Sequence, residues 1–256
     1  MNKKIILKSI FWSGLTAAIY FPASIATTIH LSGHEDPDIQ EYVDENIEQI
    51  IERQEEKIGM TYPKERPKME YLIPDYYQLM SPGIIGAYRD DTDTLYLSSG
   101  ILVEPGWELG DFIATIATFN NTASAKRTLD HELAHFYCDK VKEQVLGKEY
   151  HLFYRRLSEE ELIAHRLINE GIAKYVENTI NGEDDSLLLL ENWPVETEQF
   201  SGHMVYQCGY ALVKPIIDKH REKGIQFLLF NPPLPKELLT PEQYQERILT
   251  DIRKLQ

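Results

Sequence analysis

The stretch from His131 to His135 constrains this chain most, because it puts two imidazoles and a carboxylate on one predicted helix. Residues four apart on an α-helix lie on the same face, so His131 and His135 can bind one metal ion. Glu132 lies beside them and can accept a proton from a water molecule that zinc activates. The pattern fixes only three positions, so chance occurrence is the alternative that the rest of the sequence must decide.

Apolar residues continue around this segment at steps of three to four residues, which predicts a packed helix. The buried stripe consists of Leu129, Leu133, Phe136 or Tyr137, Val141 and Val145. Gly147 is a stop signal for the helix. The two histidines are therefore expected on a helix that packs against the core.

Two later segments carry further signals. Residues 167–177 read Leu-Ile-Asn-Glu-Gly-Ile-Ala-Lys-Tyr-Val-Glu, and residues 203–213 read His-Met-Val-Tyr-Gln-Cys-Gly-Tyr-Ala-Leu-Val. A capping-box pattern from Ser158 to Glu161 predicts a helix that begins near residue 159 and holds Glu170 well inside it. His165 lies on a different face of that helix, and we expect it to be structural.

In this order the three segments resemble the gluzincin zinc peptidases, which include thermolysin and the gluzincin aminopeptidases. The likeness covers roughly residues 60 to 230 and is closest to the small peptidase-MA-like, or minigluzincin, group. It implies an α+β, zincin-like metallopeptidase fold with a small mixed sheet packed on the His131 helix and a mainly helical C-terminal part. It also implies zinc as the cofactor, with His131, His135 and Glu170 as ligands and a fourth position open for water.

The resemblance implies peptide-bond hydrolysis with Glu132 as general base. Residues 203–213 are similar to the Tyr-x-x-Gly-x-Ala-Leu helix that carries an oxyanion-stabilising tyrosine in the aminopeptidases, which makes Tyr206 the candidate. His203 and Tyr210 lie three and four residues away on the same helix and are the alternatives. We expect an endopeptidase, because the chain lacks the Gly-x-Met-Glu-Asn strand that holds a free amine. The alternative function is a zincin-fold module that binds zinc or a partner without peptide turnover.

The formal net charge of −15 argues against a nucleic-acid partner, because phosphates would be repelled over most of the surface. The sequence contains no glycine-rich phosphate loop and no serine-centred elbow, so it does not support a nucleophilic hydrolase. The expected partner is a peptide or protein substrate.

Residues 1–26 have the layout of a signal peptide. Lysines precede an apolar run, and Ser24-Ile25-Ala26 fits a cleavage site after Ala26. The prediction is an exported protein, secreted or in the cell envelope, with one metallopeptidase domain over residues 27–256. The alternative is an uncleaved anchor, because the mostly apolar stretch 10–31 is long enough to span a bilayer and associate the protein with the membrane.

The remaining patterns concern the sheet and the cysteines. Apolar runs at 84–88 and 94–98 flank an acidic turn and predict a β-hairpin, which by resemblance lies beside the metal helix and pairs with extended substrate. Residues 69–74 predict a short strand. Cys138 and Cys208 could form a disulfide in an oxidising compartment or remain two buried thiols.

Overall fold

The computed structural model describes most of the chain beyond its first residues. The described residues are 37–71, 86–90, 92–97, 122–183, 193–200 and 202–254. The signal-peptide or anchor prediction for residues 1–26 lies outside them. Within them the chain is mostly helical with one small mixed sheet, in agreement with the predicted α+β class. None of the helices in this part of the chain is both long enough and apolar enough to cross a membrane.

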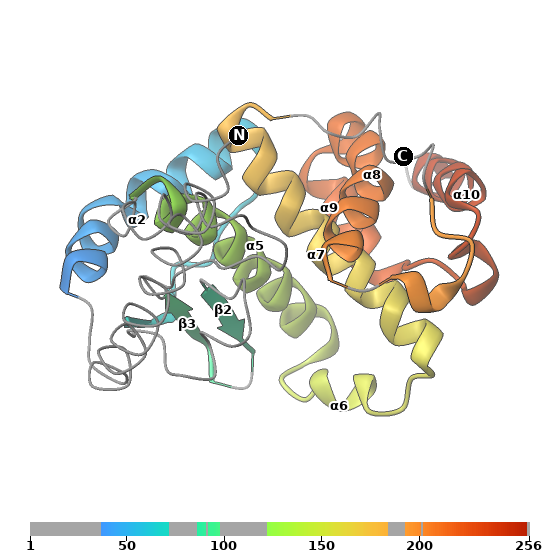
Figure 1. Cartoon of the computed structure of the whole chain (residues 1–256), viewed down its shortest axis with the longest axis horizontal. Coiled ribbons are helices and arrows are strands. Elements are labelled where there is room, and N and C mark those ends of the chain that lie inside the picture. The colour runs from blue at the N-terminus through green and yellow to red at the C-terminus, as the bar shows by residue number, and fades with distance from the viewer. Residues whose placement is uncertain are drawn as a thin grey trace, which may run out of the picture.

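Helices and strands are largely separate along the chain: the three short strands follow the first described helix, and the other helices follow the strands. Along the chain they are α2 (Pro37–Ile58), β1 (Lys68–Tyr71), β2 (Gly86–Arg89), β3 (Thr94–Leu97), α5 (Thr122–Leu146), α6 (His151–Tyr154), α7 (Glu159–Asn181), η3 (Thr197–Gln199), α8 (His203–His220), α9 (Glu222–Phe230), η4 (Pro235–Glu237) and α10 (Pro241–Lys254). The sheet lies beside α5, while α8, α9 and α10 gather on the other side of α7 (Figure 1). The site helices α5 and α7 therefore form the centre of the molecule.

The sheet has the strand order β1-β3-β2. β1 runs parallel to β3, and β2 runs antiparallel to β3 with Tyr88 opposite Leu95. The predicted hairpin is confirmed, and its turn holds Asp93 at a φ of 50°. Both β2 and β3 contact α5, and among the described strands β2 pairs only with β3. An edge of the sheet thus lies along the helix that carries the histidines.

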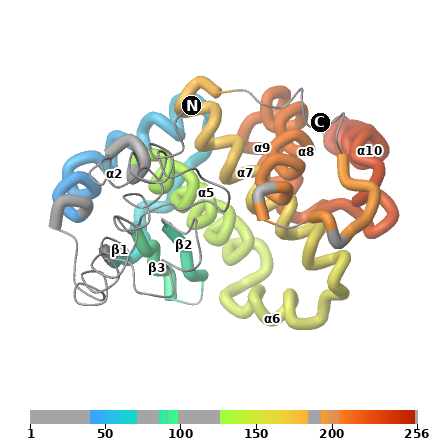
Figure 2. The backbone as a smooth tube through the Cα atoms, in the orientation of Figure 1, coloured from blue at the N-terminus to red at the C-terminus, as the bar shows by residue number. Residues whose placement is uncertain are grey.

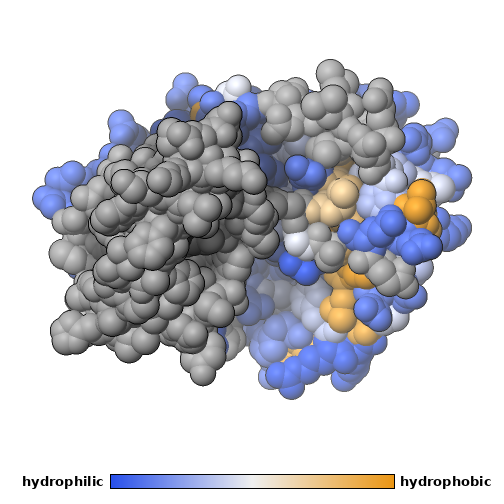
Figure 3. Space-filling view, viewed as in Figure 1, coloured by the Kyte–Doolittle hydropathy of each residue, from blue (hydrophilic) through white to orange (hydrophobic). Residues whose placement is uncertain are grey.

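The core forms where α5 packs against the sheet, α2 and α7. Most of the predicted α5 stripe is buried: Leu129, Leu133, Phe136, Tyr137 and Val141. The prediction for Val145 is wrong, because its side chain is 63% exposed. The last turn of α5 extends beyond the elements that cover the rest of the helix, and the chain turns at Gly147 with a φ of 84°. On the face shown in Figure 3, the described residues outside the grey region are mostly hydrophilic, with small groups of apolar side chains among them.

Two glycines set the distance between α7 and α8. A Cβ atom added to Gly209 would lie 2.3 Å from the carbonyl oxygen of Leu167 and 2.8 Å from the Cα atom of Gly171. A Cβ atom added to Gly171 would lie 2.4 Å from the carbonyl group of Gly209. Figure 2 shows α7 running between α5 and α8. The backbones of α7 and α8 therefore meet at a crossing that only glycine permits.

Replacing Gly209 by Ala is expected to destabilise the protein. Alanine favours a helix over glycine by about 1 kcal/mol, so the change would stabilise α8 if space allowed. The clash with rigid backbone atoms opposes this, and overpacking typically costs about 1–3 kcal/mol. Urea unfolding should show a lower free energy of unfolding for Gly209→Ala. The control Gln207→Ala, an exposed position on the same helix, should change it by less than about 0.5 kcal/mol. A stabilised Gly209→Ala protein would contradict the close crossing.

Candidate metal centre

Helix α5 supplies the first two side chains of the site. His131 and His135 lie one turn apart on the face that turns toward α7, and both are largely shielded from solvent. Their Nε2 atoms are 3.2 Å apart. The spacing of four residues therefore brings two ring nitrogens to one point, as the sequence predicted.

Glu170 on α7 completes a triangle with these two atoms. Its Oε2 atom lies 3.4 Å from Nε2 of His131 and 3.3 Å from Nε2 of His135. A tetrahedral zinc ion with bonds of roughly 2.0–2.1 Å holds its ligand atoms about 3.3 Å apart. The three donor atoms already have this separation, and together they could hold a metal ion. Two imidazoles and one carboxylate are also the donor set of catalytic rather than structural zinc sites.

Burial and the contacts within the cluster shift the pKa values of Glu170 and His131 in opposite directions. Burial raises the pKa of Glu170, but the contacts with His131 and His135 outweigh this and hold its pKa well below the usual range. Burial lowers the pKa of His131, but the contacts with Glu170 and Glu177 and the charge of Glu132 raise it to about 9. At neutral pH Glu170 is therefore ionised and His131 carries a proton, which a metal cation can replace.

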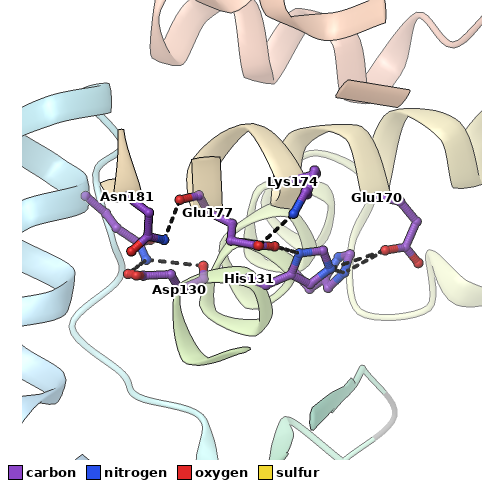
Figure 4. Close-up of polar contacts among 8 residues, drawn as sticks. Asp130, His131, Glu170, Lys174, Glu177 and Asn181 are labelled. Atoms are coloured by element: carbon purple, nitrogen blue, oxygen red, sulfur yellow. Dashed lines mark hydrogen bonds and ion pairs between the residues drawn. The ribbon is translucent and has the colours of Figure 1, made fainter. Parts of the chain in front are cut away.

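A second carboxylate, for which the sequence predicted no role, lies on the other side of His131. Oε2 of Glu177 is 3.3 Å from Nδ1 of His131, an ion-pair distance without the alignment of a hydrogen bond. Lys174 Nζ lies 2.6 Å from the other oxygen of Glu177 (Figure 4). Glu177 follows Glu170 by seven residues (177 − 170), which is about two helical turns, so both face α5. That spacing is the signal that could have identified it.

His135 has an outer partner as well. The amide nitrogen of Asn169 lies 3.2 Å from Nδ1 of His135. The amide oxygen of Asn169 accepts a hydrogen bond of 3.0 Å from Lys142 Nζ. Groups behind the imidazoles fix the orientation of metal-binding histidines. Both rings therefore have a polar neighbour on the nitrogen that faces away from the candidate metal position.

The start of α5 is tied to α2 next to the histidines. Asp130, fully buried, accepts a hydrogen bond of 3.0 Å from Gln54 Nε2 and pairs with Arg53 at 3.3 Å. Figure 4 shows the Asp130 side chain turned away from the imidazole of His131. Burial raises the pKa of Asp130, while Gln54 and Arg53 oppose the increase. These contacts hold the turn of α5 from which His131 projects.

Glu132 lies between the sheet and the candidate metal position. Its Oε2 atom accepts a hydrogen bond of 2.8 Å from the backbone N–H of Tyr88 on β2. Its side chain borders a cleft of about 620 Å³ that also contains His131, His135 and Glu170. The cleft separates β2 and α5 on one side from α7 and α8 on the other. A carboxylate in this position can act on a water molecule next to the metal.

Tyr206 on α8 reaches the same cleft, whereas Tyr210 does not border it. The ring of Tyr206 lies 5.7 Å from the His131 ring between centroids. Burial and the charges of Glu170 and Glu132 raise the pKa of its hydroxyl, and Arg166 opposes them. Tyr210 is only 2% exposed and packs against Tyr175 in the core. The side chain of His203, the other alternative, lies outside the described residues.

The α7–α8 crossing explains why Tyr206 is near Glu170. Glu170 directly precedes Gly171, and Tyr206 lies three residues before Gly209. Because the two glycines touch, the turns next to them are also brought together. The second and third sequence segments are therefore two sides of one helix contact.

His165 packs as the predicted structural residue and also borders the cleft. Its ring packs against Tyr154 at 5.1 Å between centroids, which agrees with a structural role. It also borders the cleft, which the sequence did not predict. Burial and the nearby charge of Lys142 lower its pKa to about 4, so it is neutral at neutral pH.

Cys138 and Cys208 are free and buried, and they belong to separate groups of core residues. Burial raises the pKa of each thiol to about 12. The alternative of two buried thiols therefore describes this structure, and the disulfide is not formed.

Comparison with known protein families, curated proteins and solved structures finds no match for this chain. The site contains a partly buried triangle of His131, His135 and Glu170 that borders the cleft.

Proposed function

We propose that this chain is a zinc-dependent peptidase of gluzincin type with a zincin-like fold, and that it cleaves within polypeptides. The triangle of donor atoms carries the proposal, because its edges of 3.2, 3.3 and 3.4 Å match those of a tetrahedral zinc site. Glu132 and Tyr206 beside it supply the two further groups that the reaction needs. The absence of an amine-binding motif favours endopeptidase over aminopeptidase action.

Glu132 and Tyr206 have different roles in the proposed reaction. When bound, a zinc ion polarises the scissile carbonyl and lowers the pKa of a water molecule to about 7. Glu132 accepts the proton of the attacking water and passes it to the leaving amine. The hydroxyl of Tyr206 donates a hydrogen bond to the oxygen that becomes negative. The hydroxyl can donate because a tyrosine is protonated at neutral pH, and burial raises its pKa further.

The edge strand β2 offers a place for the substrate backbone. Gly86, Ala87 and Tyr88 of β2 border the cleft next to Glu132. An extended peptide can add to such an edge through backbone hydrogen bonds, which bind it with little dependence on its side chains. This arrangement suits a polypeptide substrate rather than a small molecule.

Metal titration is the direct test of the site. We expect the metal-free protein to bind one zinc ion per chain and to release about one proton near pH 7, because His131 has a pKa of about 9 and must be neutral to bind. The apparent affinity should then rise about tenfold per pH unit up to pH 9. Calorimetry in buffers of different ionisation enthalpy measures both quantities. Near-stoichiometric zinc in a His131→Ala, His135→Ala double variant would refute the site.

Digestion of an unfolded protein by the same preparation tests turnover. The proposed enzyme should cleave it only when zinc is bound, and peptides with a blocked N-terminus should be cleaved at the same rate as peptides with a free amine. A protein that binds zinc stoichiometrically but leaves every peptide intact would instead be a zinc-binding or partner-binding module. Faster cleavage of peptides with a free amine would indicate an aminopeptidase.

A further inference from the structure

The cleft continues well beyond the candidate metal position. Helices α5 and α7 form its two long walls, and the region of α6 closes its far end. The residues that border this extension include Asp139, Lys142, Tyr150, Tyr154, His165 and Arg166. The resemblance and the site geometry leave these side chains without a role. They would contact the substrate residues next to the scissile bond.

Arg166 stands out among them because it faces the reaction centre without a carboxylate partner. It precedes Glu170 by four residues, so the two lie on the same face of α7. It is exposed, borders the cleft and lies close enough to the Tyr206 hydroxyl to lower its pKa. Within the described part of the chain it forms no ion pair, whereas Arg53, Arg66, Arg127 and Arg247 each pair with a carboxylate. In a protein with a net charge of −15, a cleft guanidinium that forms no ion pair among the described residues is available to an anionic ligand.

The other basic side chains of the extension are already occupied or neutral. Lys142 donates to Asn169 and lies 5.5 Å from the centre of the Tyr154 ring. His165 is neutral at neutral pH, because burial lowers its pKa. Arg166 contacts the Tyr206 hydroxyl, but its side chain is exposed and a guanidinium has five N–H donors, so it can take an anionic partner in addition.

Three of the four carboxylates that border the cleft already have partners other than Arg166, and the fourth, Asp90, lies near Asp139. Asp139 accepts a hydrogen bond of 2.9 Å from the Tyr88 hydroxyl, and Glu132 accepts from the Tyr88 backbone, both on the opposite wall. Glu170 contacts the two imidazoles. Among the described residues these carboxylates have other partners, so the Arg166 guanidinium is open to a carboxylate of the substrate.

We propose that Arg166 makes the site selective for substrates with a carboxylate within about two residues of the scissile bond. One turn of α7 separates Arg166 from Glu170 by about 6 Å along the axis, and an extended peptide advances about 3.3 Å per residue. A guanidinium binds a carboxylate through two parallel hydrogen bonds, which fixes orientation as well as charge. The carboxylate belongs to an aspartate or glutamate side chain or to a chain terminus. This inference names a substrate class for the proposed peptidase site.

Binding to a zinc-loaded Glu132→Gln protein tests the inference without turnover. The probes are short fluorescein-labelled peptides of alanine and leucine that contain one Asp or, at the same position, one Asn, each with a free or an amidated C-terminus. Fluorescence anisotropy should give at least about tenfold tighter binding for the carboxylate-bearing member of a pair, the usual size of a charged hydrogen bond. A preference for Asp identifies a side-chain carboxylate, and a preference for the free C-terminus identifies a terminal one.

Variants of Arg166 assign the preference to this residue. Arg166→Gln should abolish it, and Arg166→Lys, which keeps the charge but loses the paired hydrogen bonds, should retain only part of it. Arg253→Gln, an exposed arginine on α10, should leave it unchanged. Equal binding of all probes, or a preference that survives Arg166→Gln, would overturn the inference. A preference that depends on Arg166 in a protein that cleaves nothing would uphold the recognition site and refute the proposed peptidase.

Discussion

Glu132→Gln is expected to keep its zinc and to lose turnover by about 10²–10⁴-fold, the usual contribution of a general base. Glutamine has almost the same shape, and its amide oxygen can still accept the hydrogen bond that the Tyr88 N–H donates to Glu132. The substitution therefore leaves the hairpin contact and the His131, His135 and Glu170 triangle in place. It removes only the ability to accept a proton.

The measurement is kcat on an unfolded protein substrate together with zinc content by elemental analysis. Glu143→Gln is the matched control, because it makes the same chemical change on the same helix and pairs with Lys140 away from the cleft. It should retain both zinc and activity. Equal activity of Glu132→Gln and the unchanged protein would show that the cleavage comes from a contaminant or by another route.

The local parts of this structure could be predicted from the sequence because short-range physics determines them. The spacing of four residues alone places His131 and His135 on one face. The capping box at Ser158 forms as expected, with Glu161 N donating to its hydroxyl at 3.3 Å. The alternation of apolar runs around an acidic turn was enough to predict the β2–β3 hairpin. Each of these features depends on residues close together in the chain.

What could not be predicted depends on how distant elements meet. The error at Val145 arose because periodicity continues along α5 beyond the point where other elements cover it. The hydrogen bond from Tyr88 to Glu132 joins residues 44 positions apart, and no local pattern indicates it. In the sequence Arg166 is an ordinary exposed helix residue, and its place beside Tyr206 of α8 is known only from the structure. Gly171 and Gly209 belong to two of the sequence segments, but the reason for them, the α7–α8 crossing, exists only in three dimensions.

Tyr206→Phe is expected to lower kcat by about 10²–10³-fold with little change in zinc content or KM, as for the loss of one oxyanion donor. The ring of Tyr206 lies against His131, and phenylalanine preserves that contact while removing the hydroxyl. The effect falls on kcat because the hydroxyl binds charge that develops only in the transition state. Tyr210→Phe, one helical turn on but buried in the core, is the matched control and should stay within about twofold in kcat. If Tyr206→Phe were nearly unaffected while His203→Ala were strongly impaired, the oxyanion donor would be His203. The α7–α8 crossing would then position a different residue of α8 over the metal.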